Sequence, residues 1–205
     1  MAGSGESFES TNPFNGESLW SGAEALENEV DAAVEAANKA LKSWSSLEVA
    51  QRITYLEKFA ELLKANKEDL ATCIAKETGK PLWESLTEVG AMAGKIAISI
   101  NAFEKRCAVA SQDMPGKVSK TRYKPHGVVA VFGPFNFPGH LANGHIVPAL
   151  LAGNTAVFKP SEQTPWVAQR TVELWQEAGL PAGVLNLVQG GRKTGELLSQ
   201  HEGIQ

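Results

Sequence analysis

The sequence predicts an α/β fold, in which amino-terminal helices are followed by a Rossmann-like parallel sheet with crossover helices that is truncated. Two observations favour this fold class. Residues 26–107 place apolar side chains at helical spacing in four successive segments. Residues 128–205 alternate short, β-branched apolar runs with helical segments over short links, which is typical of parallel β-α-β units.

The start of the chain predicts an arm followed by two helices. Residues 1–25 are rich in Ser, Gly and Glu and hold two turn dipeptides, so we expect an irregular arm or a short strand pair. The apolar side chains of residues 26–44 form the stripe of an amphipathic helix. Ser45 and Glu48 match a capping box that starts the second helix. Its expected buried face is Val49, Ile53, Leu56, Phe59 and Leu63.

Two further helices complete the amino-terminal part. Asn66 is expected to cap the third helix, and Thr78-Gly79-Lys80-Pro81 supplies a glycine and a proline that end it. A fourth helix follows residue 81 and continues to Cys107. Because Cys73 and Cys107 both lie on apolar stripes, we expect reduced, unreactive core thiols.

The last third of the chain predicts the sheet. Residues 117–123 can be extended. The expected order after them is a strand at 128–132, a Gly-Pro loop and a helix, a strand at 155–158, a helix at 163–178, a strand at 184–188 and a last helix opened by residues 190–195. No fourth strand follows in these residues, so the predicted sheet is cut short.

Composition excludes several classes of protein. Hydrophobic residues make up 43% of the chain and charged residues 20%, which is ordinary for a globular protein and argues against disorder. The net charge of −4 offers no basic footprint for nucleic acid. The sequence shows neither a membrane-length apolar run nor a signal pattern, so we expect a cytoplasmic protein without a membrane partner. His140 and His145 lack further ligands at metal spacing, so we expect no metal site.

Asn136 is the most informative polar residue. It lies between Phe135 and Phe137 in a Pro/Gly loop directly after a predicted strand, where Pro138 is expected to hold it extended. A carboxamide fixed at the carboxyl end of a parallel strand can stabilise charge on a carbonyl oxygen, as in an oxyanion hole. The same pattern also fits a turn in which Asn136 bonds only its own backbone. His140 follows four residues later, and we expect it to project toward the same end of the sheet.

Two other loops carry candidate binding residues. Lys159 and Glu162 follow the second strand, and the carboxylate could accept two ribose hydroxyls. Alternatively, Ser161 caps the next helix and Glu162 lies in its first turn. Gly191 and Gly195 could turn free N–H groups toward a phosphate, although such glycines also serve turn geometry alone.

Several stretches, taken in order, resemble the aldehyde dehydrogenase superfamily. They are residues 77–81, 133–138, 153–155, 158–162, 178–186 and 190–195, and the likeness covers essentially the whole chain. Within the superfamily, residues 132–151 are most similar to dehydrogenases of semialdehydes. The resemblance implies oxidation of an aldehyde to an acid with NAD, through a cysteine nucleophile and a glutamate that activates water.

The resemblance also implies roles for particular residues. Asn136 matches the catalytic asparagine of the oxyanion hole. The residues that match cofactor contacts are Phe132, Gly133, Pro134, Phe135, Lys159, Ser161, Glu162, Gly191 and Gly195. The family's catalytic Cys and Glu and its catalytic domain lie beyond Gln205, so we expect this chain to be an amino-terminal fragment that is inactive by itself.

The expected division of the chain follows from the same resemblance. Residues 1–116 are expected to form the arm and the helical part of the cofactor-binding domain, residues 117–124 an oligomerisation-arm strand, and residues 125–205 the first half of the NAD-binding sheet. The full-length enzyme is then expected to act on a small aldehyde as a homo-oligomer. Two alternatives are another aldehyde dehydrogenase, such as one for succinate semialdehyde, and a noncatalytic nucleotide-binding module.

Overall fold

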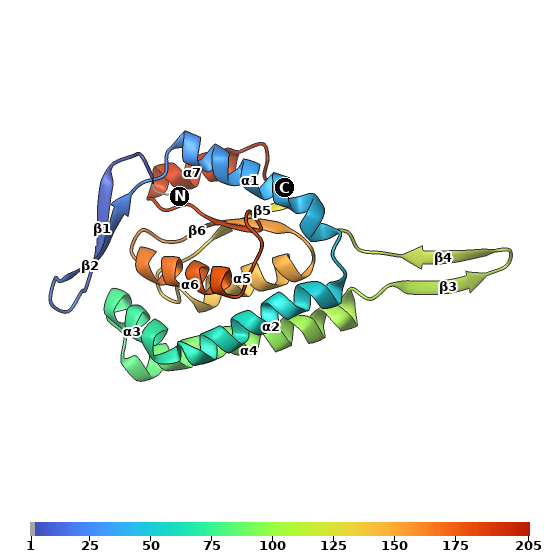
Figure 1. The fold of residues 1–205 in the computed structure, drawn as a ribbon, viewed down its shortest axis with the longest axis horizontal. Coiled ribbons are helices and arrows are strands. Elements are labelled where there is room, and N and C mark those ends of the chain that lie inside the picture. The colour runs from blue at the N-terminus through green and yellow to red at the C-terminus, as the bar shows by residue number, and fades with distance from the viewer. Residues whose placement is uncertain (1–2) are drawn as a thin grey trace.

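A three-stranded parallel sheet lies at the centre of the computed structural model, which describes residues 3–205 (Figure 1). Its strands are β5 (Val128–Phe132), β6 (Thr155–Lys159) and β7 (Leu185–Leu187), in the order β5-β6-β7. The three predicted strands and their parallel pairing are confirmed, with β7 shorter than predicted. Residues 1 and 2 of the predicted arm lie outside the described part of the chain.

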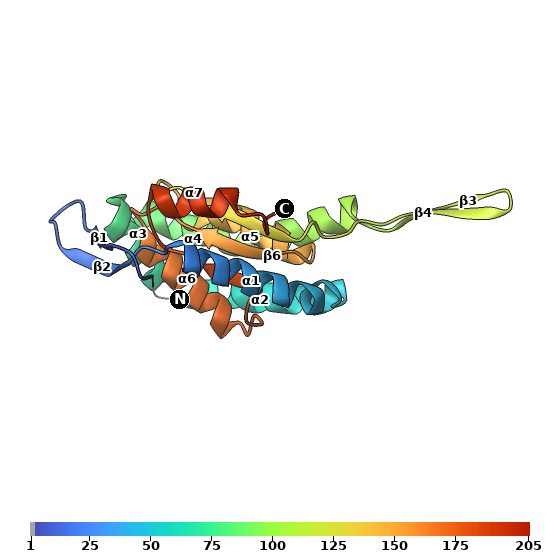
Figure 2. The same cartoon turned by 90° about the horizontal axis from the view of Figure 1, so that it is seen from above.

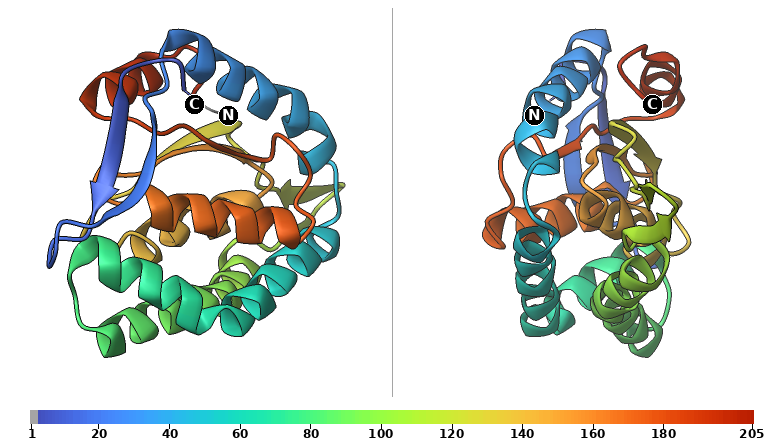
Figure 3. Two further views of the ribbon diagram at one scale, coloured as in Figure 1. Left: turned by 60° about the vertical axis from the view of Figure 1, so that its left-hand side comes forward. Right: turned by 90° about the vertical axis from the view of Figure 1, so that its right-hand side faces the viewer.

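Helices cover both faces of the sheet (Figures 2 and 3). α1 (Glu27–Ser45) and α7 (Arg192–Gln200) pack on one face, and α5 (His140–Leu151) and α6 (Pro165–Glu177) pack on the other. A further layer packs against α5 and α6, formed by α2 (Val49–Ala65), α3 (Lys67–Thr78) and α4 (Leu82–Arg106). The seven predicted helices are therefore confirmed, and they enclose one apolar core on each face of the sheet.

The buried stripes of the helices join these layers. Phe59 of α2 stacks on Trp175 of α6 with ring centroids 3.8 Å apart. Polar groups on the stripes find backbone partners across the core, as buried polar groups must. The Trp44 indole donates to the Leu150 carbonyl at 3.1 Å, and Arg52 Nε donates to the Leu151 carbonyl at 2.9 Å. These bonds fix α1 and α2 to the carboxyl end of α5.

The predicted cap of α2 is wrong, and that of α3 is confirmed in position only. Ser45 belongs to the last turn of α1, and α2 starts instead from Glu48, whose backbone N–H donates to the Gln51 side chain at 2.9 Å. The buried face of α2 contains Leu56, Phe59 and Leu63 as predicted, whereas Arg52 and Ala60 replace Val49 and Ile53, which are only partly buried. Asn66 occupies the N-cap position of α3 as predicted, but its side chain donates to the Leu62 carbonyl of α2 at 2.9 Å and makes no capping bond to α3. α3 ends at Gly79, whose φ of +72° is left-handed, as the predicted glycine stop requires.

Two antiparallel hairpins extend from this body. β1 (Ser7–Thr11) pairs with β2 (Ser18–Ala23), which confirms the predicted strand pair. β4 (Lys117–Thr121) confirms the predicted extended segment, and it pairs with β3 (Ala110–Met114), which the sequence pattern did not predict. The β3–β4 hairpin is exposed along its whole length and projects away from the helices (Figure 1). No helix within residues 3–205 is long and apolar enough to span a membrane.

Candidate functional site

The predicted site residues gather at the carboxyl edge of the sheet. Phe132, the last residue of β5, pairs with Lys159, the last residue of β6. The loops that leave these two strands therefore start side by side, where ligands bind in open α/β sheets. A Cβ atom added to Gly195 of α7 would lie 3.6 Å from Lys159 Cε and 3.9 Å from the Phe132 ring. Three predicted residues that are far apart in the sequence are thus neighbours in space.

The loop between β5 and α5 begins with a glycine that its surroundings require. The Gly133 N–H donates to the Lys159 carbonyl at 2.9 Å, which draws the loop against β6. A Cβ atom at this position would lie 2.9 Å from the Phe158 ring, so any other residue here would force the loop or the ring to move. After this tight start, Pro134 is half-buried and Phe135 is 55% exposed. The loop therefore continues outward from the sheet edge.

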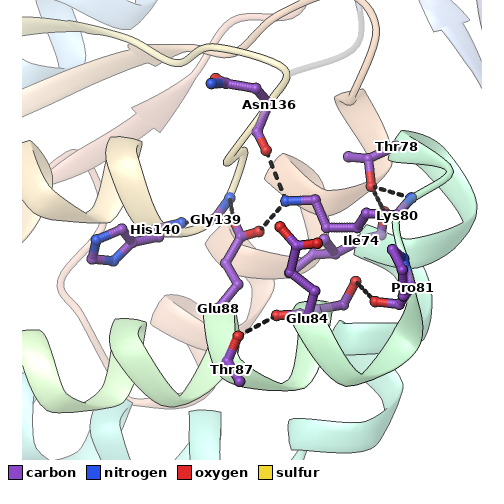
Figure 4. A network of polar contacts seen from close by, with 11 residues as sticks. Ile74, Thr78, Lys80, Pro81, Glu84, Thr87, Glu88, Asn136, Gly139 and His140 are labelled. Carbon is purple, nitrogen blue, oxygen red and sulfur yellow. Dashed lines mark hydrogen bonds and ion pairs between the residues drawn. The ribbon is translucent and has the colours of Figure 1, made fainter.

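The Asn136 carboxamide is exposed and makes no hydrogen bond to any residue from 3 to 205. Figure 4 shows its backbone carbonyl directed toward Lys80, while the carboxamide points the opposite way. The alternative in which this side chain bonds its own backbone is therefore absent from the described contacts. Pro138 directly restricts Phe137 rather than Asn136, so the expected stiffening of Asn136 by proline needs another source.

That source is a pair of charged residues from the helical layer (Figure 4). Lys80 Nζ donates to the Asn136 carbonyl at 2.7 Å and contacts Glu88 Oε2 at 2.9 Å. Glu88 Oε1 accepts the N–H groups of Gly139 and His140 at 3.0 and 3.1 Å. A carboxylate at this point also faces the positive end of α5. The loop is thus held at its middle by Lys80 and at its carboxyl end by Glu88.

The loop after β6 holds a buried cation. Lys159 is 7% exposed, and its Nζ donates to the Pro160 carbonyl at 2.8 Å and lies 3.7 Å from Glu162 Oε2. Burial lowers the pKa of the Lys159 ammonium, and the carboxylate of Glu162 opposes that shift. Because the Glu162 side chain is half exposed, its carboxylate can still reach a ligand.

The helix-start alternative for this second loop is wrong for both Ser161 and Glu162. α6 begins at Pro165, so Glu162 lies before the helix and not in its first turn. The Ser161 hydroxyl accepts the Gln163 N–H at 3.2 Å, which forms a local turn rather than a helix cap. The free N–H groups at the start of α6 are instead satisfied by Glu77 of α3. Glu162 is consequently free of a structural role in the helix.

The start of α7 is also occupied by a carboxylate. The Gly191 N–H donates to Glu24 Oε1 at 2.9 Å, so it is not free for a phosphate. Gly195 lies inside α7 rather than in the turn before it, and its backbone faces Lys159 and Phe132. Gly195 therefore shapes the surface beside Lys159, whereas the Gly191 N–H is bonded to Glu24.

Sequence reasoning missed Lys80, Glu88, Glu77 and Glu24 as contributors to this edge. Glu77 and Lys80 were interpreted only as part of a helix end. Glu88 and Glu77 are buried, at 3% and 6% exposure, although carboxylates are rarely buried unless paired. The usable signal was an acidic residue on the inward face of a predicted amphipathic helix, because such a residue needs a partner from elsewhere in the fold.

Neither cysteine belongs to the site. Cys73 is buried in α3, and desolvation raises the pKa of its thiol to about 11, as expected for an inert core residue. Cys107 departs from the prediction, because α4 ends at Arg106 and leaves this thiol only partly buried. His140 also departs from it, because Figure 4 shows its ring directed away from the Asn136 side chain. Within residues 3–205, no three metal-ligating side chains form a cluster.

A cavity lies away from this edge of the sheet. It measures about 750 Å³ and is lined by residues of β2, α6 and β7, including Trp20, Trp175 and Leu187. None of the predicted site residues lines it. The predicted site is an exposed edge rather than an enclosed pocket of the described residues.

Comparison with known proteins gives consistent matches. A family model described as the aldehyde dehydrogenase family matches residues 1–205. The N-succinylglutamate 5-semialdehyde dehydrogenase of Hahella chejuensis is 56% identical over 204 residues, which cover 100% of this chain and 42% of that relative.

Two solved structures share the fold. The betaine aldehyde dehydrogenase of Staphylococcus aureus, in complex with NAD+, matches with a TM-score of 0.90 and 30% identity over 97% of this chain and 41% of that chain. The NADP-dependent glyceraldehyde-3-phosphate dehydrogenase of Bacillus halodurans C-125, complexed with NADP, matches with a TM-score of 0.91 and 31% identity over 98% of this chain and 44% of that chain. The chain thus spans less than half the length of the relatives it matches.

Proposed function

The chain belongs to the aldehyde dehydrogenase family, and we propose that it forms the amino-terminal, cofactor-binding part of an enzyme that oxidises an aldehyde to a carboxylic acid with NAD. The observation that carries this proposal is the meeting of Phe132, Lys159 and Gly195 at the carboxyl edge of the sheet. The Asn136 carboxamide, which is exposed and bonds no residue from 3 to 205, lies on the loop that leaves the same edge.

The residues present fit the adenosine half of a nicotinamide cofactor. Gly195 leaves open the space beside Lys159, because a Cβ atom there would make only ordinary contacts. A ligand in this space meets an ammonium group from Lys159 and an exposed carboxylate from Glu162. The carboxylate favours two free ribose hydroxyls over a 2′-phosphate, which supports NAD rather than NADP. The backbone of Gly133, Pro134 and Phe135 would line the cleft beside them.

Asn136 supplies the electrophilic group in this proposal. Its N–H donates to the carbonyl oxygen of the aldehyde as negative charge develops there, and one such donor contributes about 10²–10³ in rate. The cofactor, when bound, supplies the hydride acceptor. We place the cysteine nucleophile and the general base in the rest of the enzyme. Cys73 is buried with its thiol pKa raised to about 11, and Cys107 follows the far end of α4 from Glu88, which holds the Asn136 loop.

We extend the proposal to the substrate and to the assembly. The 56% identity to N-succinylglutamate 5-semialdehyde dehydrogenases supports oxidation of N-succinyl-L-glutamate 5-semialdehyde to N-succinyl-L-glutamate, a step of arginine catabolism. The exposed β3–β4 hairpin, which holds most of residues 117–124, would serve as the oligomerisation arm. Residues 1–116 and 125–205 would form the helical part and the first half of the NAD-binding sheet.

Steady-state NADH formation tests this function. The full-length enzyme should reduce NAD with N-succinylglutamate 5-semialdehyde, with a higher kcat/KM than with succinate semialdehyde or with NADP as the cofactor. The 205-residue chain, measured in parallel, should form no NADH. A full-length enzyme that turns over neither aldehyde would contradict the proposal. NAD binding without turnover of any aldehyde would support a noncatalytic nucleotide-binding module instead.

A further inference from the structure

Lys80 connects the helical layer to the loop of Asn136. It lies in the short link between α3 and α4, and its ammonium group contacts three parts of its surroundings. Nζ is 2.7 Å from the Asn136 carbonyl oxygen, 2.9 Å from Glu88 Oε2 and 4.0 Å from the centroid of the Phe137 ring. Sequence patterns do not predict the contact between Lys80 and Asn136, because these residues are far apart in the sequence.

The side chain of Glu88, the partner of Lys80, is fully buried, and both of its carboxylate oxygens accept hydrogen bonds. The Glu88 side chain is 0% exposed, and the Lys80 side chain is 11% exposed. One carboxylate oxygen accepts from Lys80, and the other accepts from the backbone N–H groups of Gly139 and His140. A buried carboxylate in this position holds its partners strongly, since leaving it unpaired is costly.

We propose that Lys80 and Glu88 are positioning residues for the reaction, and that they fix the direction in which the Asn136 carboxamide points. This inference rests on the proposed function. Lys80 holds the carbonyl on one side of residue 136, and Glu88 holds the N–H groups three and four residues further on. With the backbone fixed at both points, the side chain leaves the loop on the side away from Lys80, as Figure 4 shows.

The two residues contribute differently. Glu88 caps α5, so part of its effect is on the stability of the fold. Lys80 bonds the carbonyl of Asn136, so its effect on the reaction in this proposal passes through the placement of Asn136. Because a misplacement of about 1 Å can cost about 10²-fold in rate, loss of the Lys80 anchor should reduce catalysis without abolishing cofactor binding.

A double-mutant cycle on the full-length enzyme tests the inference. Lys80→Met should lower kcat about 10- to 100-fold with little change in the KM for NAD. Asn136→Ala should lower it about 10²- to 10³-fold. The double variant should be no slower than Asn136→Ala alone, because Lys80 then has nothing left to position. Lys105→Met, an exposed position on α4, is the matched control and should leave kcat unchanged.

Other results would overturn the inference. Multiplying effects in the double variant would show that Lys80 acts independently of Asn136. A normal kcat for Lys80→Met, or loss of its cooperative unfolding transition, would likewise reject a positioning role. A wild-type enzyme that oxidises no aldehyde would refute the proposed function itself, whatever the variants do.

Hydrogen exchange gives a second readout that does not depend on turnover. In Lys80→Met, exchange of the amides in residues 133–140 should become at least about tenfold faster, while the strands exchange as in the wild type. Unchanged exchange in this segment would contradict the anchoring on which the proposal depends.

Discussion

Gly195→Ala should have opposite effects on the stability of the fold and on binding at the proposed cofactor surface. Gly195 lies within α7, and the added methyl group would sit 3.6 and 3.7 Å from the Lys159 side chain and 3.9 Å from the Phe132 ring. These are ordinary van der Waals distances, so the substitution fits without a shift of the neighbours. Glycine inside a helix costs about 0.5–1 kcal/mol relative to alanine. The variant should therefore be more stable than the wild type by that amount.

The same methyl group should weaken cofactor binding. It fills the space beside Lys159 that we assign to the adenosine, and overpacking of a close contact costs about 1–3 kcal/mol. We therefore expect about a tenfold higher Kd for NAD or more. Urea unfolding of the 205-residue chain measures the first effect, and calorimetric titration of the full-length enzyme with NAD measures the second.

A matched control isolates the helix effect. Gly90 lies inside α4 and is exposed, and a Cβ atom added there would meet nothing within 4 Å. Gly90→Ala should give a similar gain in stability and no change in NAD affinity. If Gly195→Ala binds NAD as tightly as the wild type does, the surface beside Lys159 is not the adenosine site and the reasoning is refuted.

Two further predictions concern buried titratable groups. Native chain treated with iodoacetamide at pH 8 should be labelled at Cys107 and not at Cys73, because a thiol pKa of about 11 leaves about one Cys73 in a thousand as thiolate; peptide mass spectrometry that finds Cys73 labelled first would contradict its burial. Burial raises the pKa of the Glu77 carboxyl, so the folded state binds its proton more tightly than the unfolded state does. Once the pH rises above the ordinary pKa of a glutamate, this group therefore lowers the free energy of unfolding. The free energy of unfolding of Glu77→Gln, minus that of the wild type, should accordingly increase between pH 4.5 and pH 7. A difference that does not change with pH would exclude this linkage.

Local patterns explain why most of the fold could be predicted. Helical spacing of apolar residues marked α1 to α4, and the β-branched runs of β5 and β6 marked buried parallel strands. β3 was missed because Ala110–Met114 has no apolar alternation and is exposed along its length. Its pairing depends on the hairpin turn with β4 rather than on a core.

The site was predictable only where its residues follow strands. Parallel strands bring their carboxyl ends to one edge, so Phe132 and Lys159 could be expected to meet. The places of Glu24, Glu77 and Glu88 could not be predicted, because each accepts one or two backbone N–H groups at a helix start that is distant in sequence. Such contacts depend on how the helical layers pack on one another, which the spacing of residues in the sequence does not predict.

The kinetic effect of Asn136→Ala on the full-length enzyme tests the central claim most directly. With N-succinylglutamate 5-semialdehyde and saturating NAD, kcat should fall about 10²- to 10³-fold while the Kd for NAD stays at the wild-type value. A variant that keeps the wild-type kcat would show that this carboxamide does not face the reacting carbonyl group.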